Sequence, residues 1–400
     1  MLVAHGASEV VVAPGEVLED AALAVEGGRV VAVGPTAEVV REHPPENAER
    51  AIDAGGKTVM PGFVDSHTHA LFAGDRSDEF AAKLRGESYG DILAAGGGIL
   101  RTVRSVREAS DEELLGNLLS HLDVMLANGT TTVEVKSGYG LDRETELRML
   151  DVLARANREH PVDVVPTFMG AHAVPEGRDA DEYADEVVDD QLPAVAEQGV
   201  AEFCDVFCEE GVFSVEQSRR VLEAGVEYGL TPKVHAEELS RLGGAQLAAE
   251  VGAASADHLL HATREDAEAL AEAGVTPVFL PGTAFGLGAE YADPAPFVEA
   301  GATPAIATDF NPNCFSRSMG FATTVACVGM RMAPADAIAA ATHGGACALD
   351  REGDGTGTLR EGSPADLQVL DATSHVHVPY DFDTNRVECV VKAGEVVLDD

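Results

Sequence analysis

The chain has 400 residues, of which 69 are acidic and 27 are basic, so its formal net charge is −42 at pH 7. A field of this sign repels nucleic acids and anionic membrane surfaces, and it argues against both as partners. The acidic residues are spread along the chain rather than gathered in a tail, which indicates a strongly hydrated surface suited to high salt.

Both ends of the chain have β-strand character. Short strand-like runs separated by glycine occupy the first 58 residues, and runs of the same kind return near the C-terminus. Hairpin signals stand at Gly27-Gly28 and Gly55-Gly56. We therefore expect one small β-sandwich-like domain assembled from residues 1–58 and 356–400.

Between the two ends, apolar runs alternate with amphipathic helical stretches. One such stretch, 110–129, begins with a capping box of Ser110 and Glu113 and stops at Gly129. Eight runs have strand character, namely 58–69, 131–138, 162–172, 201–209, 231–238, 255–262, 276–281 and 303–310. Eight strand–helix units predict the α/β class and a (β/α)8 TIM-like barrel over residues 59–355. An open doubly wound sheet is the alternative, although no strand is followed by a GxGxxG turn.

The sequence carries no signal for export or membrane insertion. No basic N-terminal region precedes an apolar run, and no stretch approaches about 20 apolar residues in a row. The six cysteines are dispersed, which is typical of buried thiols in a reducing cytoplasm. Cys204 and Cys208 could instead form a metal-binding pair. We expect a cytoplasmic protein.

Metal-binding side chains recur at the predicted strand ends, which meet at one rim of such a barrel. His67 and His69 stand two residues apart after the first strand, so their side chains leave the same face. His235 and Asp309 would complete a nitrogen-rich set that leaves a position for water. This set suits one Zn²⁺ or iron ion, and the residues do not choose between them. Such an ion would activate the water for hydrolysis.

Three further side chains at this rim could take part in the reaction. Glu238, three residues beyond His235, could move protons between water and a leaving nitrogen. His258 and Asp309 could orient the attacking water or polarise the bond under attack, and His172 ends the third strand. We expect the remaining histidines of the central region and C-terminus to have ordinary core or surface roles: His121, His160, His261, His343, His375 and His377.

A chain this acidic needs a local cation if its substrate is an anion. Arg76, just past the first strand, could form a bidentate pair with a substrate carboxylate. Tyr139, after the second strand, could add a hydroxyl donor. A surface ion pair of Arg76 with Asp75 or Asp78 fits the spacing equally well.

Motifs at these positions identify a resemblance to known enzymes. The stretches "PGFVDSHTH", "HAEE", "ATDFNP" and "GTLREGSPADLQVLD" resemble the amidohydrolase superfamily. Within it, "FAGDR", "AGGGI", "KSGYG", "FMGAHAVP" and "TDFNPN" resemble the imidazolonepropionase family over residues 55–375. The first three of these motifs are much more specific than the HxH pair.

The resemblance implies hydrolytic opening of 4-imidazolone-5-propanoate, a small anion, to N-formimidoyl-L-glutamate in histidine degradation. It also implies a homodimer with one divalent metal per chain, Zn²⁺ or Fe²⁺/Fe³⁺. The metal ligands would be His67, His69, His235 and Asp309. The substrate contacts would be Arg76, Tyr139, His172, Glu238, Asn311, Asn313 and Cys314, with His258 near the reacting centre. Where the family usually has glycine and a hydroxyl residue, this chain has Asn313 and Cys314.

Two other functions remain compatible with the sequence. One is another cyclic amidohydrolase or an aminohydrolase (deaminase) of the same superfamily, whose neutral substrates would give Arg76 no role. The other is a metal-dependent binding protein without catalysis, although Glu238 and Asp309 are both present. Binuclear members of the superfamily use a carboxylated lysine on the fourth strand. The run 201–209 contains no lysine, which favours one metal.

Overall fold

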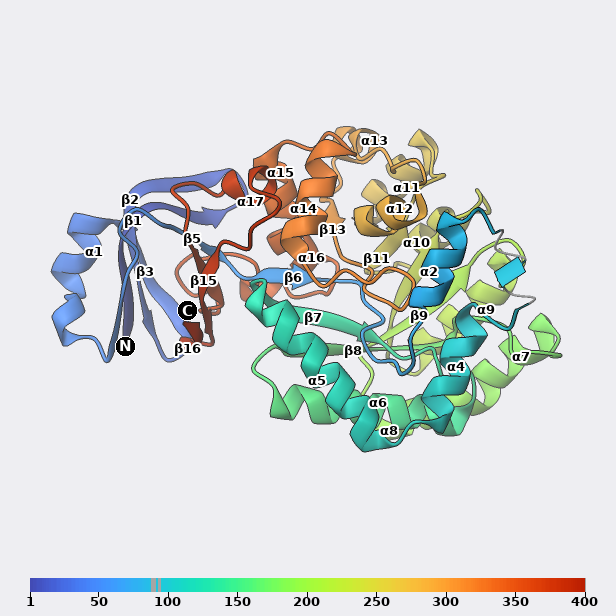
Figure 1. The fold of residues 1–400 in the computed structure, drawn as a ribbon. Coiled ribbons are helices and arrows are strands. Elements are labelled where there is room, and N and C mark those ends of the chain that lie inside the picture. The colour runs from blue at the N-terminus through green and yellow to red at the C-terminus, as the bar shows by residue number, and fades with distance from the viewer. Residues whose placement is uncertain (88–90, 93–94, 400) are drawn as a thin grey trace.

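The computed structural model describes residues 1–87, 91–92 and 95–399. It contains two eight-stranded sheets. One sheet is built from the two chain ends and the other from the middle of the chain, and the two stand side by side in Figure 1. Within the described ranges, no helix is both long and apolar enough to cross a membrane.

The middle of the chain forms a parallel barrel. Its strands are β6 (Phe63–Asp65), β7 (Thr130–Lys136), β8 (Asp163–Ala171), β9 (Phe203–Cys208), β10 (Thr231–Ala236), β11 (Ser255–His258), β12 (Thr276–Phe279) and β13 (Ala305–Ile306). They pair in chain order from β6 to β13, and a parallel bridge between Thr68 and Phe310 brings the two edge strands together. The predicted barrel is confirmed, and the open-sheet alternative is wrong.

The first predicted strand is divided between the two sheets. Residues Thr58–Pro61 form β5 of the terminal sheet, and β6 of the barrel starts at Phe63. Gly62 lies between them, where an added Cβ would stand 2.3 Å from the side chain of Thr131. Only glycine allows the chain to pass so close to the neighbouring strand. The sequence runs on without a break in hydrophobicity, so the pattern alone does not reveal this division.

Helices surround the barrel. In chain order they are α2 (Ser77–Leu84), α4 (Ile99–Glu108), α5 (Asp111–Ala127), α6 (Arg143–Glu159), α7 (Ala180–Glu186), α8 (Leu192–Gln198), α9 (Val215–Glu227), α10 (Gly244–Glu250), α11 (Arg264–Ala273), α12 (Pro281–Leu287), α13 (Ala295–Ala300), α14 (Met319–Val328), α15 (Pro334–Ala339) and α16 (Gly345–Cys347). Ser110 caps α5 by accepting the backbone N–H of Glu113 at 3.2 Å, which is one half of the predicted capping box. The stretch "AGGGI" (95–99) leads directly into α4.

The terminal sheet is mixed. It contains β1 (Leu2–Ala13), β2 (Glu16–Glu26), β3 (Arg29–Pro35), β4 (Arg50–Asp53), β5, β14 (Leu367–Leu370), β15 (Val387–Lys392) and β16 (Glu395–Asp399), with the short helices α1 (Thr36–Glu42) and α17 (His377–Tyr380) beside it. Strand β5 joins the two chain ends, because it pairs with β1 in parallel and with β14 antiparallel.

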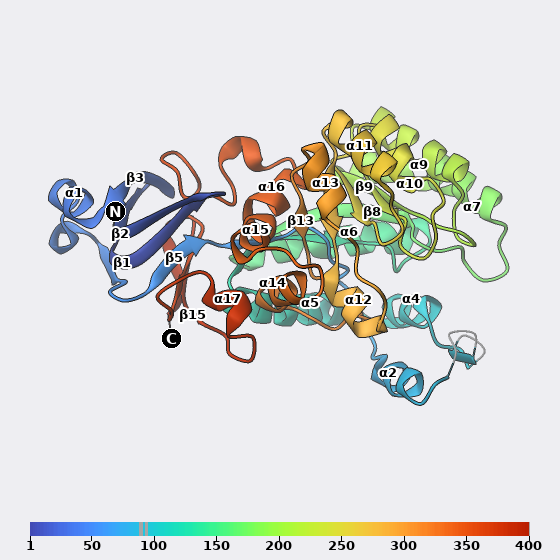
Figure 2. The same ribbon diagram turned by 90° about the horizontal axis from the view of Figure 1, so that it is seen from above.

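The terminal sheet has a core of its own and also packs against the barrel. Alternate residues of β1 point to opposite faces. Val10 and Val12 lie in the core of the sheet, whereas Val11 belongs to the large core of the barrel. Figures 1 and 2, at right angles to each other, both place this sheet next to α14, α16 and α17. The exact domain boundaries at 58/59 and 355/356 stay a prediction.

Candidate active site

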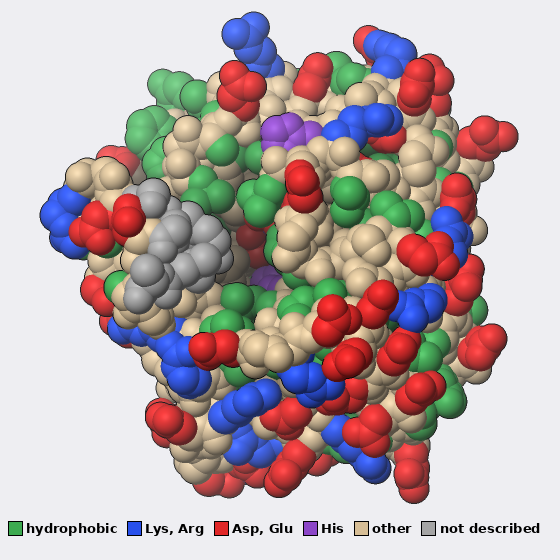
Figure 3. Space-filling view, turned by 90° about the vertical axis from the view of Figure 1, so that its right-hand side faces the viewer, with side chains coloured by type: hydrophobic (Ala, Val, Ile, Leu, Met, Phe, Trp, Pro, Cys, Tyr) green, Lys and Arg blue, Asp and Glu red, His purple; other side chains and the backbone are tan. Residues whose placement is uncertain are grey.

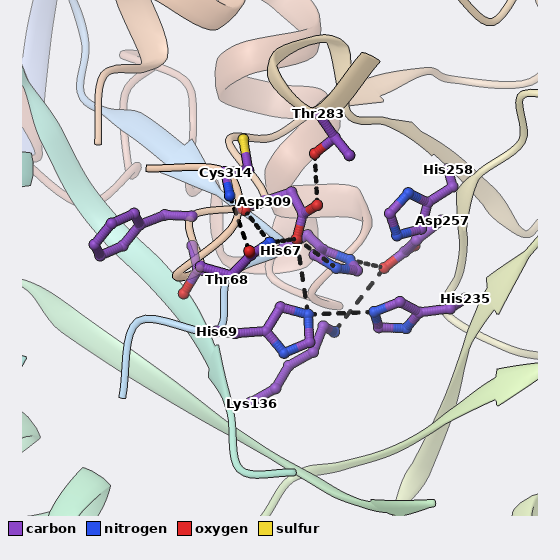
Figure 4. Close-up of polar contacts among 12 residues, drawn as sticks. His67, Thr68, His69, Lys136, His235, Asp257, His258, Thr283, Asp309 and Cys314 are labelled. Atoms are coloured by element: carbon purple, nitrogen blue, oxygen red, sulfur yellow. Dashed lines mark hydrogen bonds and ion pairs between the residues drawn. The ribbon is translucent and has the colours of Figure 1, made fainter. Parts of the chain in front are cut away.

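Three histidines from two strand ends converge inside the barrel rim. His67 and His69 follow β6, His235 is on β10, and their ligand nitrogens all lie within 4.8 Å of one another. Asp309, which follows β13, places Oδ1 3.7 Å from Nε2 of both His67 and His69. Figure 4 shows these four side chains directed toward one another. The structure therefore brings together all four residues that the sequence predicts as metal ligands.

Two of the imidazoles are oriented by buried carboxylates. His67 Nδ1 lies 2.6 Å from Asp257 Oδ2, and His235 Nδ1 lies 3.0 Å from Asp205 Oδ1. Because a carboxylate accepts a hydrogen bond, each Nδ1 carries the ring proton. Each Nε2 is then unprotonated, and its lone pair can bind a metal ion. The Nε2 atom of His67 is buried and makes no hydrogen bond. Carboxylate partners of this kind are typical of histidines that hold a metal.

The donor set fits a divalent cation. Burial holds the pKa of His67 and His69 well below the ordinary histidine value, so both rings are neutral at pH 7, as ligation requires. Three imidazole nitrogens and one carboxylate suit zinc or iron. Cys204 and Cys208, the alternative pair, are buried free thiols of β9. Within the described part of the chain, the three histidines are the one group of this kind.

The backbone bends sharply where the site residues leave their strands. Positive φ angles occur here at the non-glycine residues Glu237 (56°), His258 (81°), Leu259 (60°) and Asp309 (49°). L-residues rarely adopt this conformation, and it is common at functional sites. Asp309 is then fixed by two donors, since Thr283 Oγ1 lies 2.5 Å from its Oδ2 and Asn311 Nδ2 lies 3.0 Å from its Oδ1.

Glu238 and His258 face each other beside the histidine group. Glu238 Oε2 lies 3.6 Å from His258 Nε2, and neither ring nitrogen of His258 makes a hydrogen bond. Burial, and next the nearby Asp309 carboxylate, raise the pKa of Glu238 to about 8. A carboxyl group with a pKa near the working pH can both accept and donate a proton. Its side chain is 16% exposed, so it can meet a substrate.

Tyr139 and His172 line the other side of the group. The ring of His172 stacks on His69 with centroids 4.7 Å apart, and Tyr139 lies 5.3 Å from His172. His172 Nδ1 lies 2.9 Å from the Gly138 carbonyl, so Nδ1 carries the proton and Nε2 can accept a hydrogen bond. Glu146 holds the loop that carries Tyr139, because its carboxylate accepts the backbone N–H groups of Gly138, Gly140 and Leu141 at 2.7–2.9 Å.

Arg76 is not the surface residue that the alternative interpretation assumed. Its side chain is only 9% exposed, and it pairs with Glu79, with Nη2 2.8 Å from Oε2. Asp75 instead accepts the backbone N–H of Ser77, and Asp78 pairs with Arg101. Both acids predicted as surface partners are therefore occupied elsewhere. Arg76 is a largely buried cation at the start of α2, held by one carboxylate.

The loop after β13 is organised by Asn311. Its Oδ1 accepts the backbone N–H groups of Asn313 at 2.7 Å and Cys314 at 3.0 Å. The Asn313 N–H, which could have served a substrate, is thus already bonded within the loop. The Asn313 side chain contacts Lys83 of α2, and Cys314 Sγ points to the Thr308 carbonyl at 3.6 Å. Substrate contacts at Asn313 and Cys314 stay predictions.

Sequence reasoning missed the residues that support the site from behind. Most are charged, and the set is Glu134 and Lys136 on β7, Asp205 on β9, Asp257 on β11, Glu146 on α6 and Thr283 on α12. The sequence did contain a signal that could have identified the four residues on the strands. Each is an ionisable side chain within a run that is otherwise apolar, and such a residue is buried only when it is paired.

The histidines predicted to be ordinary lie apart from the group of three. His121 is buried against Phe72, with Nδ1 3.0 Å from the Ala70 carbonyl, and is a core residue. His160 faces Asp123, and His375 faces Glu9. His261, three residues after His258, is exposed. Figure 3 shows the face of the barrel remote from the terminal sheet, with a hollow in which histidine is visible and with acidic side chains spread over the rest of the face.

Comparisons with known proteins show the family to which the chain belongs. The family model described as "Amidohydrolase family" matches residues 58–397, and an imidazolonepropionase-like composite domain of bacteria matches residues 21–45. The chain is 68% identical to an imidazolonepropionase of Haloarcula marismortui, over 99% of this chain and 95% of that one. It is 65% identical to an imidazolonepropionase of Halobacterium salinarum, over 99% and 97% of the two chains.

Solved structures of low sequence identity share the fold. An adenosine deaminase from Xanthomonas campestris, with bound zinc, superposes with a TM-score of 0.76 at 20% identity, covering 100% of this chain and 93% of that one. The family model spans most of the chain, and the relatives match it almost from end to end. The chain therefore belongs to the amidohydrolase family and, within it, to the imidazolonepropionases.

Proposed function

We propose that the chain hydrolyses 4-imidazolone-5-propanoate to N-formimidoyl-L-glutamate, a step of histidine degradation. The observation that carries the proposal is the 68% identity, over 99% of this chain, to a protein named imidazolonepropionase. The site geometry supports it, because a nitrogen-rich ligand group, a protonatable carboxyl group and a buried arginine gather at one barrel rim.

One divalent ion, zinc or iron, would be held by the four predicted ligands His67, His69, His235 and Asp309. When bound, it would supply Lewis acidity, which lowers the pKa of water and polarises a carbonyl group. The fit of the donor set supports this assignment, since three ligand nitrogens lie within 4.8 Å of one another and His67 Nε2 makes no hydrogen bond.

The protein's own groups would move the proton. Water adds to the ring carbonyl carbon, and the carbon–nitrogen bond of the cyclic amide breaks. Glu238 would take one proton of the water on Oε2 and deliver it to the departing ring nitrogen. His258, 3.6 Å away, would orient the carbonyl oxygen during this transfer. The product is a carboxylate and an open-chain formimidoyl amine.

The substrate's propanoate would bind Arg76, with help from Tyr139. We expect Arg76→Ala to raise KM by roughly 10- to 100-fold with a smaller change in kcat, because a charge-assisted hydrogen bond contributes about 1.5–3 kcal/mol. Initial rates over a range of imidazolone concentrations measure this. Arg85→Ala is the control, since Arg85 is exposed and pairs with nearby Glu87 on the surface. An unchanged KM in Arg76→Ala would remove Arg76 from substrate binding.

The cellular setting and the assembly of the protein are proposed from its charge, its relatives and the family resemblance. We propose a cytoplasmic enzyme of a salt-rich cell, and a homodimer as the resemblance implies. The acidic excess and the named relatives from Haloarcula and Halobacterium support the salt-rich setting.

We expect the unfolding midpoint to rise as KCl increases from about 0.1 M to about 1 M, because the Debye length falls from about 10 Å to about 3 Å and screens the self-repulsion of the acidic surface. Thermal unfolding followed by circular dichroism measures this. A midpoint that is flat or falls with salt would contradict the high-salt interpretation.

Loss of imidazolone absorbance on adding purified protein in molar KCl tests the proposed reaction. Metal content is measured on the same sample. Loss of absorbance with about one metal ion per chain, and no release of ammonia, is the expected result. No loss of absorbance with metal bound would reject the substrate, and release of ammonia from a neutral heterocycle would favour the deaminase alternative.

A further inference from the structure

A lysine with no exposed surface lies next to the candidate metal centre. Lys136 ends β7, and its side chain is completely buried. Its Nζ lies 2.6 Å from Glu134 Oε1, 2.7 Å from Asp205 Oδ2 and 4.0 Å from Asp257 Oδ2. Figure 4 shows the side chain reaching past His69 toward Asp257. One ammonium group therefore faces three carboxylates.

Two of these carboxylates are the ones that orient the histidines. Asp205 uses Oδ2 for Lys136 and Oδ1 for His235 Nδ1. Asp257 uses Oδ2 for His67 Nδ1, and this same atom is the one nearest to the ammonium. Lys136 thus stands between two carboxylate–imidazole pairs that belong to different strands. It is too deeply buried to meet a substrate.

The charges explain why a cation is needed at this point. Asp205 and Asp257 would repel each other in an interior of low dielectric constant if nothing stood between them. A buried ammonium that faces both offsets this repulsion, and it favours the observed side-chain rotamers of both carboxylates through a hydrogen bond to Asp205 and an ion pair with Asp257. The rotamers in turn decide whether the two Nδ1–H groups find their acceptors and whether the Nε2 atoms point to the centre.

We propose that Lys136 is a positioning residue that sets how tightly the site holds its metal ion. It acts through Asp205 on His235 and through Asp257 on His67. This inference rests on the proposed ligand set but not on the identity of the substrate.

The test measures zinc retention, independently of turnover. Zinc-loaded protein is equilibrated with a series of chelator concentrations, and the zinc retained after desalting is measured by atomic emission. We expect Lys136→Met to weaken zinc binding by roughly 10- to 100-fold, the usual range for a partner that supports a ligand. Lys136→Arg keeps the charge and should recover most of this loss.

Lys392→Met is the matched control. Lys392 is also a buried lysine that faces carboxylates, but it lies on β15 of the terminal sheet, and its Nζ lies 2.6 Å from Oδ2 of both Asp163 and Asp366. Its loss should lower the unfolding midpoint and leave zinc binding close to that of the wild type. Equal loss of zinc in both variants, or no loss in Lys136→Met, would overturn the proposal.

A double substitution locates the pathway of the effect. If Lys136 acts through Asp205, the loss of zinc affinity in the double variant Lys136→Met with Asp205→Asn is smaller than the product of the two single losses. Fully multiplicative losses would contradict this.

Glu134→Gln is the substitute test if Lys136→Met does not fold. It removes the charge of the other carboxylate that holds the ammonium, and it should weaken zinc binding in the same direction. Unchanged zinc binding would reject the role of Lys136. Normal zinc behaviour without imidazolone turnover would reject the substrate and leave this inference intact.

Discussion

Replacement of Glu238 by glutamine is expected to lower kcat by at least about 100-fold while the protein keeps its metal. Glutamine has nearly the same shape but cannot accept a proton from water or return it to the leaving nitrogen. Burial and the nearby Asp309 carboxylate raise the pKa of Glu238 to about 8, so the group is poised to do both near neutral pH. The substitution removes this capacity without removing any of the four predicted ligands.

Steady-state kinetics and metal analysis on the same preparation measure the effect. Glu250→Gln is a matched control, because Glu250 is an exposed carboxylate that pairs with Arg219 at the end of α10. It should leave kcat and metal content unchanged. If Glu238→Gln turned over imidazolone at a near-normal rate, proton transfer would have to be assigned to another group, with His258 the nearest.

The barrel could be predicted because its physical signals are local. Each strand is an apolar run of the right length, and each is followed by a helical stretch with its own start and stop signals. The same alternation placed His67, His69, His235 and Asp309 at strand ends, and the rule that these ends share one rim was sufficient to bring them together. Strand order alone was therefore enough to predict that these four side chains converge.

The contacts that hold these residues could not be predicted in the same way. Asp205 and Asp257 are separated by 52 positions in the sequence, and only the barrel closure brings both to Lys136. The partner of Arg76 was also missed, since Asp75 and Asp78 were considered but not Glu79. The choice of Glu79 depends on α2 starting at Ser77, and helix boundaries are the least certain part of a sequence-based prediction.

The few lysines of the chain all lie at positions where they contact a specific partner. The sequence has lysine at only five positions: 57, 83, 136, 233 and 392. Lys136 and Lys233 are buried in the barrel, Lys392 contacts Asp163 and Asp366 at 2.6 Å, and Lys57 pairs with Glu388 at 2.5 Å. Lys83 contacts Asn313. Each lysine therefore has a specific partner, while the exposed surface carries carboxylates and arginines.

His69→Ala is expected to abolish metal binding at the candidate centre and to lower activity by at least about 1,000-fold, because the Lewis acidity of a bound ion contributes several kcal/mol to hydrolysis. His69 occupies the middle of the group, with Nε2 3.3 Å from His235 Nε2 and 3.7 Å from Asp309 Oδ1. Alanine removes that nitrogen and also the ring on which His172 stacks.

His121→Ala separates loss of the metal from loss of the fold. His121 is also a buried histidine, but its Nδ1 lies 3.0 Å from the Ala70 carbonyl and its ring packs on Phe72. Its removal should cost about 3 kcal/mol of unfolding free energy, as for other buried rings, and leave about one metal ion per chain. Metal analysis with denaturant unfolding distinguishes the two variants. If His69→Ala kept its metal, the assignment of His69 as a ligand would be wrong. If both variants lost the metal together, the loss would follow from damage to the barrel core rather than from removal of a donor atom, and the assignment would again fail.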